Sequence, residues 1–389
     1  MSEPISILEL RSVHGTGGGP DKTILAGARR LDERRFPTTV CYLRSESDSA
    51  FNIDQQARSA GVDYVEVRER WSFDWRVWVE LRQLVRRRRV DIVHAHDYKT
   101  DLLALLLRRE GVIPLATVHG WTGQTTRERL LYYPADKRIL ARFPRLIAVS
   151  DQIKGELVAA GSEPSRVVTV VNGIDHNLFR RQVTREPGIR AALGLAPQDV
   201  VIGAVGRLER QKRFDILIDV FAELRKTRPG LRLLIVGDGS LRPVLEAQAA
   251  ALQLSESCLF LGHRPDIIDL HHAFQVAVQS SDYEGTPNVV LEAMAMQTPI
   301  VATDVGGTVE VARPELEALI VPPGDPVALR SAIEHCLTDQ DGSRARVLRA
   351  RRRVEDILSF DVRMSTIARV YEDLIESSQR GGVNAGQGR

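Results

Sequence analysis

Two glutamates, Glu284 and Glu292, stand eight positions apart in the stretch Ser281–Met296 and could contact a polar ligand. The apolar run Val276–Gln279 precedes them and is expected to be a strand. Glu284 therefore belongs to a loop and Glu292 to the helix that follows. Because Glu292 is surrounded by apolar residues, its carboxylate must be paired or hydrogen-bonded. Ligand hydroxyls could donate to it, and an ion pair with an arginine is the structural alternative.

The start of that helix could bind a phosphate. Thr286 has the residue type of an N-cap, and Pro287 suits the first helical position. Asn288 and Val289 would then be the second and third helical residues. Amides at these positions have no partner within the helix, and they favour an anion.

A second group of residues could neutralise a diphosphate. Arg207 and Lys212 follow the apolar run Val200–Val205 and precede the amphipathic pattern Phe214–Leu224. They therefore lie in a strand-to-helix turn, beside a helix N-terminus whose dipole attracts anions. The alternative is that both are ordinary solvated loop bases.

A glycine-rich turn follows the first strand. Gly17, Gly18 and Gly19 would let backbone amides approach a sugar or a phosphate at a helix N-terminus. A Walker loop is excluded because Asp21 precedes Lys22, and a dinucleotide fingerprint is excluded by Pro20. A tight turn without a ligand is the alternative.

Metal binding is not expected. His94 and His96 alternate at the end of a strand with Asp97 beside them, but two histidines make an incomplete metal site. The single Asp-x-Asp motif, Asp339–Asp341, lies in a polar turn after a helical pattern, whereas a metal-binding motif of a donor site would be expected at a strand end. We expect a solvated turn there.

The elements that position these residues alternate in a βαβ rhythm along the whole chain. This pattern predicts an α/β fold with two doubly wound, Rossmann-like parallel-sheet domains that face each other across a cleft. The polar stretch 179–190 has no apolar period and is expected to be the linker between residues 1–178 and 191–358. Residues 359–389 are expected to form a C-terminal helix, which could pack back on the first domain, and a tail.

Composition narrows the class of protein. The 389 residues carry a net charge of only +2, so they generate no broad positive field for nucleic acid, and any anion site must be local. The three cysteines, Cys41, Cys258 and Cys336, lie far apart in apolar contexts, which favours free thiols in a reducing compartment. With no signal peptide and no apolar span, we expect a cytoplasmic protein, soluble or peripheral to the membrane.

The motifs together resemble the retaining GT-B glycosyltransferases of family GT4, glycosyl transferases group 1. The segment from Glu284 to Glu292 carries the family's carboxylate pair in the context Glu-Gly-Thr-Pro-Asn-Val-Val-Leu-Glu. The family's order is also matched over nearly the whole chain by the glycine-rich turn and by the motifs Asp91–His96, Ala148–Ser150, Asn172–Asp175, Gly206–Leu208 with Lys212, and Gly237–Ser240.

The resemblance implies transfer of a hexosyl-type sugar from a UDP- or GDP-sugar, with retained configuration, without a cofactor and without a metal. The acceptor would be a glycan or a lipid-linked glycan on the side of the first domain, in polysaccharide or glycolipid synthesis. Its implied site residues are Glu284 and His119 at the donor sugar, Arg207 and Lys212 at the diphosphate together with Asn288 and Val289, Glu292 at the ribose, Arg264 beside the base, and Gly17–Gly19 over the phosphate or acceptor.

Two alternatives to a transferase stay open at this stage. A nucleotide-sugar epimerase can share the fold, and a subunit that binds sugar nucleotides without turnover would carry the same motifs.

Two groups of aromatic and basic residues could lie at a membrane. Trp71, Trp75 and Trp78 precede the basic run Arg86–Arg89, and a second group consists of Tyr132, Tyr133, Lys137, Arg138 and Arg142. These could contact an anionic membrane, or they could be solvated helix faces.

Overall fold

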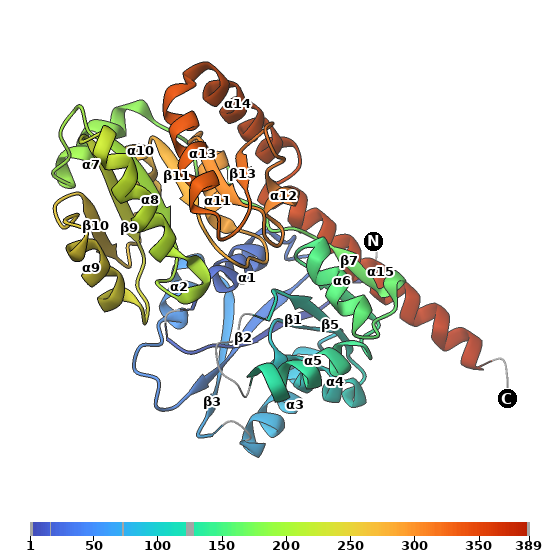
Figure 1. The fold of residues 1–389 in the computed structure, drawn as a ribbon. Coiled ribbons are helices and arrows are strands. Elements are labelled where there is room, and N and C mark those ends of the chain that lie inside the picture. The colour runs from blue at the N-terminus through green and yellow to red at the C-terminus, as the bar shows by residue number, and fades with distance from the viewer. Residues whose placement is uncertain (1–2, 16, 72–73, 122–127, 387–389) are drawn as a thin grey trace. The chain divides into compact units, whose positions relative to one another are not determined.

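The computed structural model describes residues 3–15, 17–71, 74–121 and 128–386, and the chain divides into two compact units (Figure 1). The first unit consists of Met1–Asn172 and Asp361–Arg389, and the second of Gly173–Phe360. Each unit contains one sheet in which every strand pairs in parallel with its neighbours. The prediction of two Rossmann-like parallel-sheet domains is confirmed.

The first unit has a seven-stranded sheet in the order β3-β2-β1-β4-β5-β6-β7. Its strands are β1 (Ile7–Ser12), β2 (Thr38–Ser45), β3 (Asp63–Glu69), β4 (Ile92–Ala95), β5 (Ile113–Val118), β6 (Arg145–Ala148) and β7 (Val167–Thr169). Its helices are α1 (Gly19–Arg30), α2 (Ile53–Ala60), α3 (Trp75–Arg88), α4 (Tyr98–Leu107), α5 (Tyr133–Leu140), α6 (Asp151–Ala159) and α15 (Phe360–Gly386), with short helical turns η1 (Arg108–Glu110), η2 (Glu128–Tyr132) and η3 (Pro164–Arg166).

The second unit has a six-stranded sheet in the order β10-β9-β8-β11-β12-β13. Its strands are β8 (Val200–Val205), β9 (Leu231–Val236), β10 (Cys258–Gly262), β11 (Val276–Gln279), β12 (Ile300–Thr303) and β13 (Leu319–Val321). Its helices are α7 (Glu186–Ala192), α8 (Phe214–Thr227), α9 (Arg242–Ala251), α10 (Ile267–Ala273), α11 (Asn288–Ala295), α12 (Thr308–Val311), α13 (Pro326–Thr338) and α14 (Gln340–Asp356), with turns η4 (Val183–Arg185) and η5 (Arg210–Lys212).

In both sheets the strand order reverses next to the first strand of the unit. The chain moves from β1 outward through β2 and β3, and then returns to pair β4 with β1; β8 and β11 meet in the same way. Ligands of doubly wound sheets bind at the carboxyl ends of the strands beside such a reversal. The loops after β1, β4 and β5 in one unit, and after β8 and β11 in the other, are therefore the places to look.

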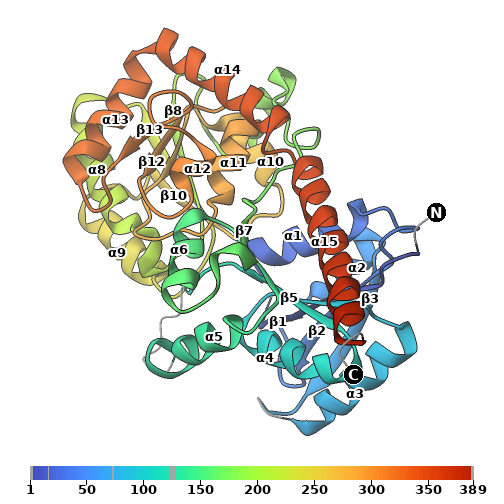
Figure 2. The same ribbon diagram turned by 90° about the vertical axis from the view of Figure 1, so that its right-hand side faces the viewer.

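The C-terminal helix α15 completes the first unit, as Figures 1 and 2 show. Met364 of α15 packs against Gly27 of α1, because a Cβ on Gly27 would come within 3.2 Å of the Met364 sulfur. Tyr371 of α15 is fully buried and reaches the sheet. Residues far apart in the sequence thus share one core.

The two units divide a few residues before the boundary expected at residue 178, and part of the expected linker 179–190 is helical. The units divide after Asn172, and residues 179–190 belong to the second unit, where α7 packs against α10. The stretch looked like a linker because it lacks an apolar period, but a polar side chain fastens it. The Arg181 guanidinium donates to the backbone carbonyls of His271 at 2.9 Å and Met296 at 2.8 Å.

A close approach in the second unit can be tested by mutation. Gly203 of β8 lies under the ring of Phe274, where an added Cβ would come within 2.3 Å of the ring. We expect Gly203→Ala to destabilise this unit by about 1–3 kcal/mol through overpacking. All four tryptophans lie in the first unit, so urea unfolding of the second unit should appear in far-UV circular dichroism without a matching change in tryptophan fluorescence.

The matched control is Gly188→Ala in α7. Nothing lies within 4 Å of a Cβ at Gly188, and alanine is favoured over glycine in a helix. This variant should unfold at the same urea concentration as the wild type or at a higher one. Equal stability of Gly203→Ala and the wild type would contradict the described packing.

Candidate functional site

Glu284 lies in the loop between β11 and α11, and only one of its two carboxylate oxygens is bound to the protein. Its Oε1 accepts hydrogen bonds from Lys212 Nζ at 2.6 Å, Ser281 Oγ at 2.6 Å and Gln279 Nε2 at 3.4 Å. Its Oε2 makes no hydrogen bond with any residue that the structure describes. The carboxylate is thus held firmly at one oxygen and keeps the other for a ligand.

The loop that carries Glu284 is fastened on two sides. The Gln211 side chain donates to the Tyr283 carbonyl at 2.6 Å, and the Ser280 hydroxyl donates to the Lys212 carbonyl at 2.8 Å. On the other side, Gly306 passes so close that an added Cβ would overlap the Glu284 carbonyl oxygen, and its φ of +53° is one that glycine tolerates. The loops after β8, β11 and β12 therefore hold one another in place.

Helix α11 begins one residue later than expected. Pro287 is the N-cap, and Asn288 and Val289 are the first and second helical residues, so the assignment of Thr286 as N-cap is wrong. Pro287 has an extended backbone with ψ of 96°, which keeps it outside the helix. The correction leaves Asn288 and Val289 in the first turn, where amides point out of the helix toward an anion.

Glu292 lies in the middle of α11, with a side chain that is only 14% exposed. No arginine among the described residues pairs with its carboxylate, and the basic group near it is His271, with Nε2 at 3.6 Å from Oε2. Within the described residues no donor forms a hydrogen bond with this carboxylate. The carboxylate is partly exposed, so water can reach it, and ligand hydroxyls could replace that water.

The basic residues expected at the diphosphate and at the nucleobase differ in their surroundings. The Lys212 side chain is only 16% exposed, and its ammonium donates to Glu284, which leaves two of its three protons for a ligand. Arg207 is exposed and pairs with no described side chain. Arg264 is half-buried and donates through two nitrogens to the carboxylate of Asp266, so its guanidinium is already occupied on one edge.

The glycine-rich turn of the first unit is capped by its own acid. Asp21, the residue that ruled out a Walker loop, accepts the Gly18 amide at 2.6 Å, and it also binds Arg11 and Tyr42. The amides of Gly17 and Gly19 donate to no residue in the described part of the chain. The turn thus keeps two amides for a ligand next to a buried carboxylate.

His119 follows β5 and is half-buried at the carboxyl end of the sheet. Its Nε2 lies 3.3 Å from Nδ1 of His96, the residue after β4. Nε2 of His96 in turn lies 2.5 Å from Oε2 of Glu9 on β1. We call Glu9, His96 and His119 the imidazole row. The sequence analysis missed Glu9, although one glutamate in an apolar first strand was a visible signal.

The surroundings shift the pKa values in this row. Burial and the neighbouring His94 lower the pKa of His96 to about 4, and burial with the neighbouring His96 lowers the pKa of His119 well below its usual value. Burial would raise the pKa of Glu9, but the facing imidazoles of His94 and His96 outweigh it and lower that pKa. At neutral pH the row contains one carboxylate and two neutral rings.

Glu9, His94 and His96 have ligand atoms within 4.8 Å of one another, so we examined them as a metal site. Both nitrogens of each ring already face protein groups: His94 faces Tyr371 and Thr117, and His96 faces Glu9 and His119. The donors and acceptors are complementary without an ion. Asp97 caps α4, and Asp339 caps α14 through the Gly342 amide.

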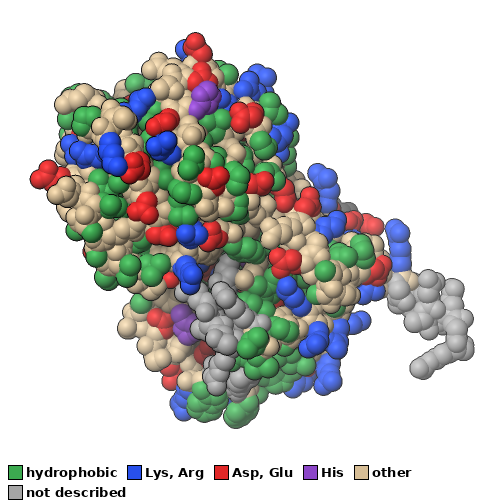
Figure 3. All heavy atoms as spheres, in the orientation of Figure 1, with side chains coloured by type: hydrophobic (Ala, Val, Ile, Leu, Met, Phe, Trp, Pro, Cys, Tyr) green, Lys and Arg blue, Asp and Glu red, His purple; other side chains and the backbone are tan. Residues whose placement is uncertain are grey.

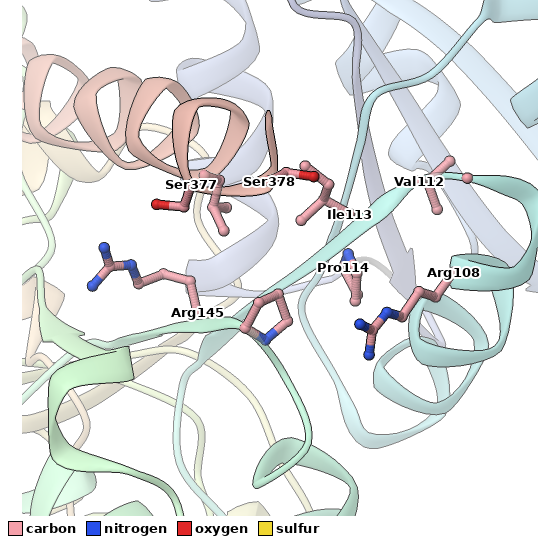
Figure 4. A pocket seen from close by; sticks show the side chains of 10 residues that line it. Arg108, Val112, Ile113, Pro114, Arg145, Ser377 and Ser378 are labelled. Carbon is pink, nitrogen blue, oxygen red and sulfur yellow. The ribbon is translucent and has the colours of Figure 1, made fainter. Parts of the chain in front are cut away.

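A cavity of about 370 Å³ lies elsewhere in the first unit (Figure 4). It is lined by Ile113 and Pro114 at the start of β5, by Arg108 and Arg145, and by Ser377 of α15. These residues mark the amino end of the sheet, opposite the end that carries His119. Parallel sheets bind substrates at their carboxyl ends, so this cavity is not the candidate site.

The tryptophans that were considered for membrane contact differ in their exposure. Trp71 and Trp75 are 58% and 69% exposed, whereas Trp78 packs against the core. On the face shown in Figure 3, basic and acidic side chains are interspersed, in keeping with a net charge of +2. Each helix in the described ranges is too short or too polar to cross a bilayer.

Comparisons with known proteins identify the family. The model of glycosyl transferases group 1 matches residues 186–354, and the model of glycosyltransferase family 4 matches residues 17–178. A putative glycosyltransferase, EpsF of Bacillus subtilis, is 33% identical over 54% of this chain and 57% of its own length.

A second relative covers more of its own length. The lipopolysaccharide core biosynthesis mannosyltransferase LpcC of Rhizobium leguminosarum bv. viciae is 30% identical over 77% of this chain and 83% of its own. The crystal structure of Anabaena HepE in complex with UDP and glucose has a TM-score of 0.83 and 21% identity, and covers 95% of this chain and 100% of that one. The chain belongs to the GT4-type glycosyltransferases of the GT-B fold, whose members include enzymes of polysaccharide and lipopolysaccharide synthesis.

Proposed function

We propose that this glycosyltransferase moves a hexosyl-type sugar from a UDP- or GDP-sugar to a glycan or lipid-linked acceptor, with retained anomeric configuration and without a metal. The observation that carries the proposal is the asymmetry of Glu284, whose Oε1 takes three protein donors while Oε2 bonds to none of the described residues. A carboxylate fixed in this way is prepared to receive sugar hydroxyls or to stabilise positive charge on the anomeric carbon.

The charge that develops on the leaving group gives a role to the basic residues Lys212 and Arg207. As the glycosidic bond breaks, negative charge grows on the departing diphosphate, and groups aimed at that charge lower the barrier. Lys212 keeps two ammonium protons after binding Glu284, and Arg207 is exposed beside it in the same loop. The first-turn amides of α11, at Asn288 and Val289, add partial positive charge. These groups do the work that a metal does in other transferases.

The nucleoside end of the donor is assigned to Glu292. No described residue donates a hydrogen bond to its carboxylate, and the two hydroxyls of a ribose would supply such hydrogen bonds. We keep Arg264 as the residue beside the nucleobase. One edge of its guanidinium is bound to Asp266, so only the other edge is available for that contact. His119 contacts the transferred sugar, and Gly17–Gly19 offer two amides to the phosphate or the acceptor. The solved relative with UDP and glucose supports a nucleotide-sugar donor.

The central pair gives the first prediction. Lys212→Ala and Glu284→Gln should each lower turnover of the donor by about 10²–10³-fold, since each removes charge aimed at the transition state. The measurement is release of free nucleotide from UDP- and GDP-sugars in the presence of acceptor. Lys226→Ala is the matched control, because Lys226 is an exposed lysine that pairs only with Glu223 on the surface of α8. Full turnover in both site variants would contradict the assignment.

Product analysis tests the reaction class. The anomeric configuration of the product, read by proton NMR, should equal that of the donor sugar. Addition of EDTA should leave the rate unchanged. An isomerised sugar nucleotide formed without acceptor would instead show an epimerase, and an inverted product would refute retention.

We further propose that the first unit contacts an anionic membrane that holds the acceptor. Tyr98, Leu102 and Leu106 are exposed at four-residue intervals on α4, and Leu130 and Leu131 are 75% and 62% exposed on η2. Stacking of Tyr98 on Tyr132, with ring centroids 5.5 Å apart, joins the two elements. Apolar side chains beside basic residues favour binding at a membrane interface.

Vesicle binding tests this surface. The wild type should co-sediment with vesicles that contain anionic lipid, and the double variant Leu130→Ser/Leu131→Ser should bind at least about tenfold more weakly, given the loss of two apolar side chains. Leu178→Ser is the control, since Leu178 is 60% exposed but belongs to the second unit. Absence of wild-type binding at low salt would refute the membrane proposal.

A further inference from the structure

The imidazole row has a direction, which follows from the groups at its two ends. Glu9 has only acceptor oxygens when it is ionised, and its pKa is lowered. Therefore Nε2 of His96, at 2.5 Å from Oε2 of Glu9, must carry a proton and donate it. A neutral imidazole has one N–H, so Nδ1 of His96 is a bare acceptor.

The next contact takes its direction from this. Nδ1 of His96 faces Nε2 of His119 at 3.3 Å, and two bare nitrogens would repel each other there. His119 must therefore carry its proton on Nε2 and donate it to His96. Its own Nδ1 is then bare, and it accepts from no residue in the described part of the chain.

The other oxygen of Glu9 fixes a separate branch. The Tyr371 hydroxyl has a single proton and donates it to Oε1 of Glu9 at 2.9 Å. Nδ1 of His94, at 2.8 Å from the Tyr371 oxygen, must then donate to it. Nε2 of His94 becomes the acceptor for the Thr117 hydroxyl at 2.7 Å. His94 thus has the opposite tautomer to His96, although both lie on the same strand and its extension.

We propose that Glu9 and His96 are positioning residues that lock His119 in its Nε2–H tautomer, so that Nδ1 of His119 accepts a hydrogen bond from a substrate hydroxyl. The inference about the tautomer stands on the hydrogen bonds of the first unit alone. The role of that tautomer toward a sugar rests on the proposed function of His119.

The physical benefit is specificity for a donor group. A neutral imidazole exchanges between its Nδ1–H and Nε2–H tautomers at little cost when no hydrogen bond fixes one of them. Each exchange would turn the nitrogen that faces the ligand from an acceptor into a donor. A buried carboxylate two residues away in the row removes this freedom. The low pKa values of His96 and His119 keep both rings neutral, so that the row retains its direction through neutral pH.

The decisive measurement is the tautomer itself in the ligand-free wild-type protein. Two-bond nitrogen–proton NMR correlations of 15N-histidine protein separate protonated from bare ring nitrogens, and single histidine variants assign the nine rings. At pH 7.5, a pH chosen above the lowered pKa values, we expect His96 and His119 as Nε2–H tautomers and His94 as the Nδ1–H tautomer. A His119 proton found on Nδ1, or a metal ion found on His94 and His96, would overturn the proposal.

Two variants test the cause. Glu9→Leu removes the acceptor at the end of the row, so the Nε2–H population of His119 should fall to a mixture of tautomers. His96→Leu removes the middle ring, and it provides the same test if Glu9→Leu does not fold. Thr117→Val is the matched control, because it alters the same buried cluster only through His94. A shift of the His119 tautomer in the control, or none in a folded Glu9 or His96 variant, would contradict the mechanism.

Turnover separates this inference from the proposed function. If the tautomer presents an acceptor to the sugar, Glu9→Leu should lower kcat by roughly 10- to 100-fold, as a misplaced reacting group does, with a smaller change in KM. A shifted tautomer with full turnover would remove His119 from the proposed site and leave the locked tautomer standing. A wild-type Nδ1–H tautomer would remove the lock, whatever the turnover.

Discussion

A carboxylate that leaves water must find a positive charge, a hydrogen-bond donor or a ligand, and this constraint organises the candidate residues of each unit. Glu284 finds the Lys212 ammonium and two side-chain donors, all at one oxygen. Glu9 finds the His96 imidazole and the Tyr371 hydroxyl, one at each oxygen. Glu292 finds no hydrogen-bond donor among the described residues. The three carboxylates thus have three different environments.

The solutions for Glu9 and Glu284 depend on parts that are distant in the sequence. Glu9 is satisfied by α15, whose Tyr371 stands 362 positions along the chain. Glu284 is satisfied by the loop after β8, 72 positions earlier. In each case the carboxylate belongs to a strand or to a strand-end loop, and a side chain from a distant segment donates a hydrogen bond to it. The helix that closes the first unit is therefore part of its polar network and not only of its apolar core.

The alternation of apolar runs and helical patterns was sufficient to predict two doubly wound domains, and motif order was sufficient to predict the family. The stretch 179–190 had the pattern of a linker because periodicity detects helices that bury an apolar face, whereas Arg181 fastens this stretch through backbone carbonyls. The expected boundary at residue 178 lies shortly after the division of the two units at Asn172.

The site was predictable only in part. Glu284, Glu292 and Lys212 stood in recognisable spacing, but the pairing of Lys212 with one oxygen of Glu284 depends on atomic positions that no spacing encodes. The row from Glu9 to His119 needed the register of β1 against β4, which places Glu9 opposite His94. The register between two strands that are distant in the sequence depends on the whole sheet. The first strand alone therefore shows an unusual glutamate but not its partners.

The difference between Glu284 and Glu292 also has an energetic consequence. Glu284 is already fixed at one oxygen, so in the proposed reaction its carboxylate would need no further rearrangement at the transition state. Glu292 accepts no hydrogen bond from a described residue, and in the proposed reaction the hydroxyls of the sugar nucleotide would replace water at its carboxylate. Its hydrogen bonds would form equally with the bound donor and with the transition state, so they strengthen binding without accelerating the chemical step. On the proposed function, one helix and the loop before it would place a group for affinity and a group for rate eight residues apart.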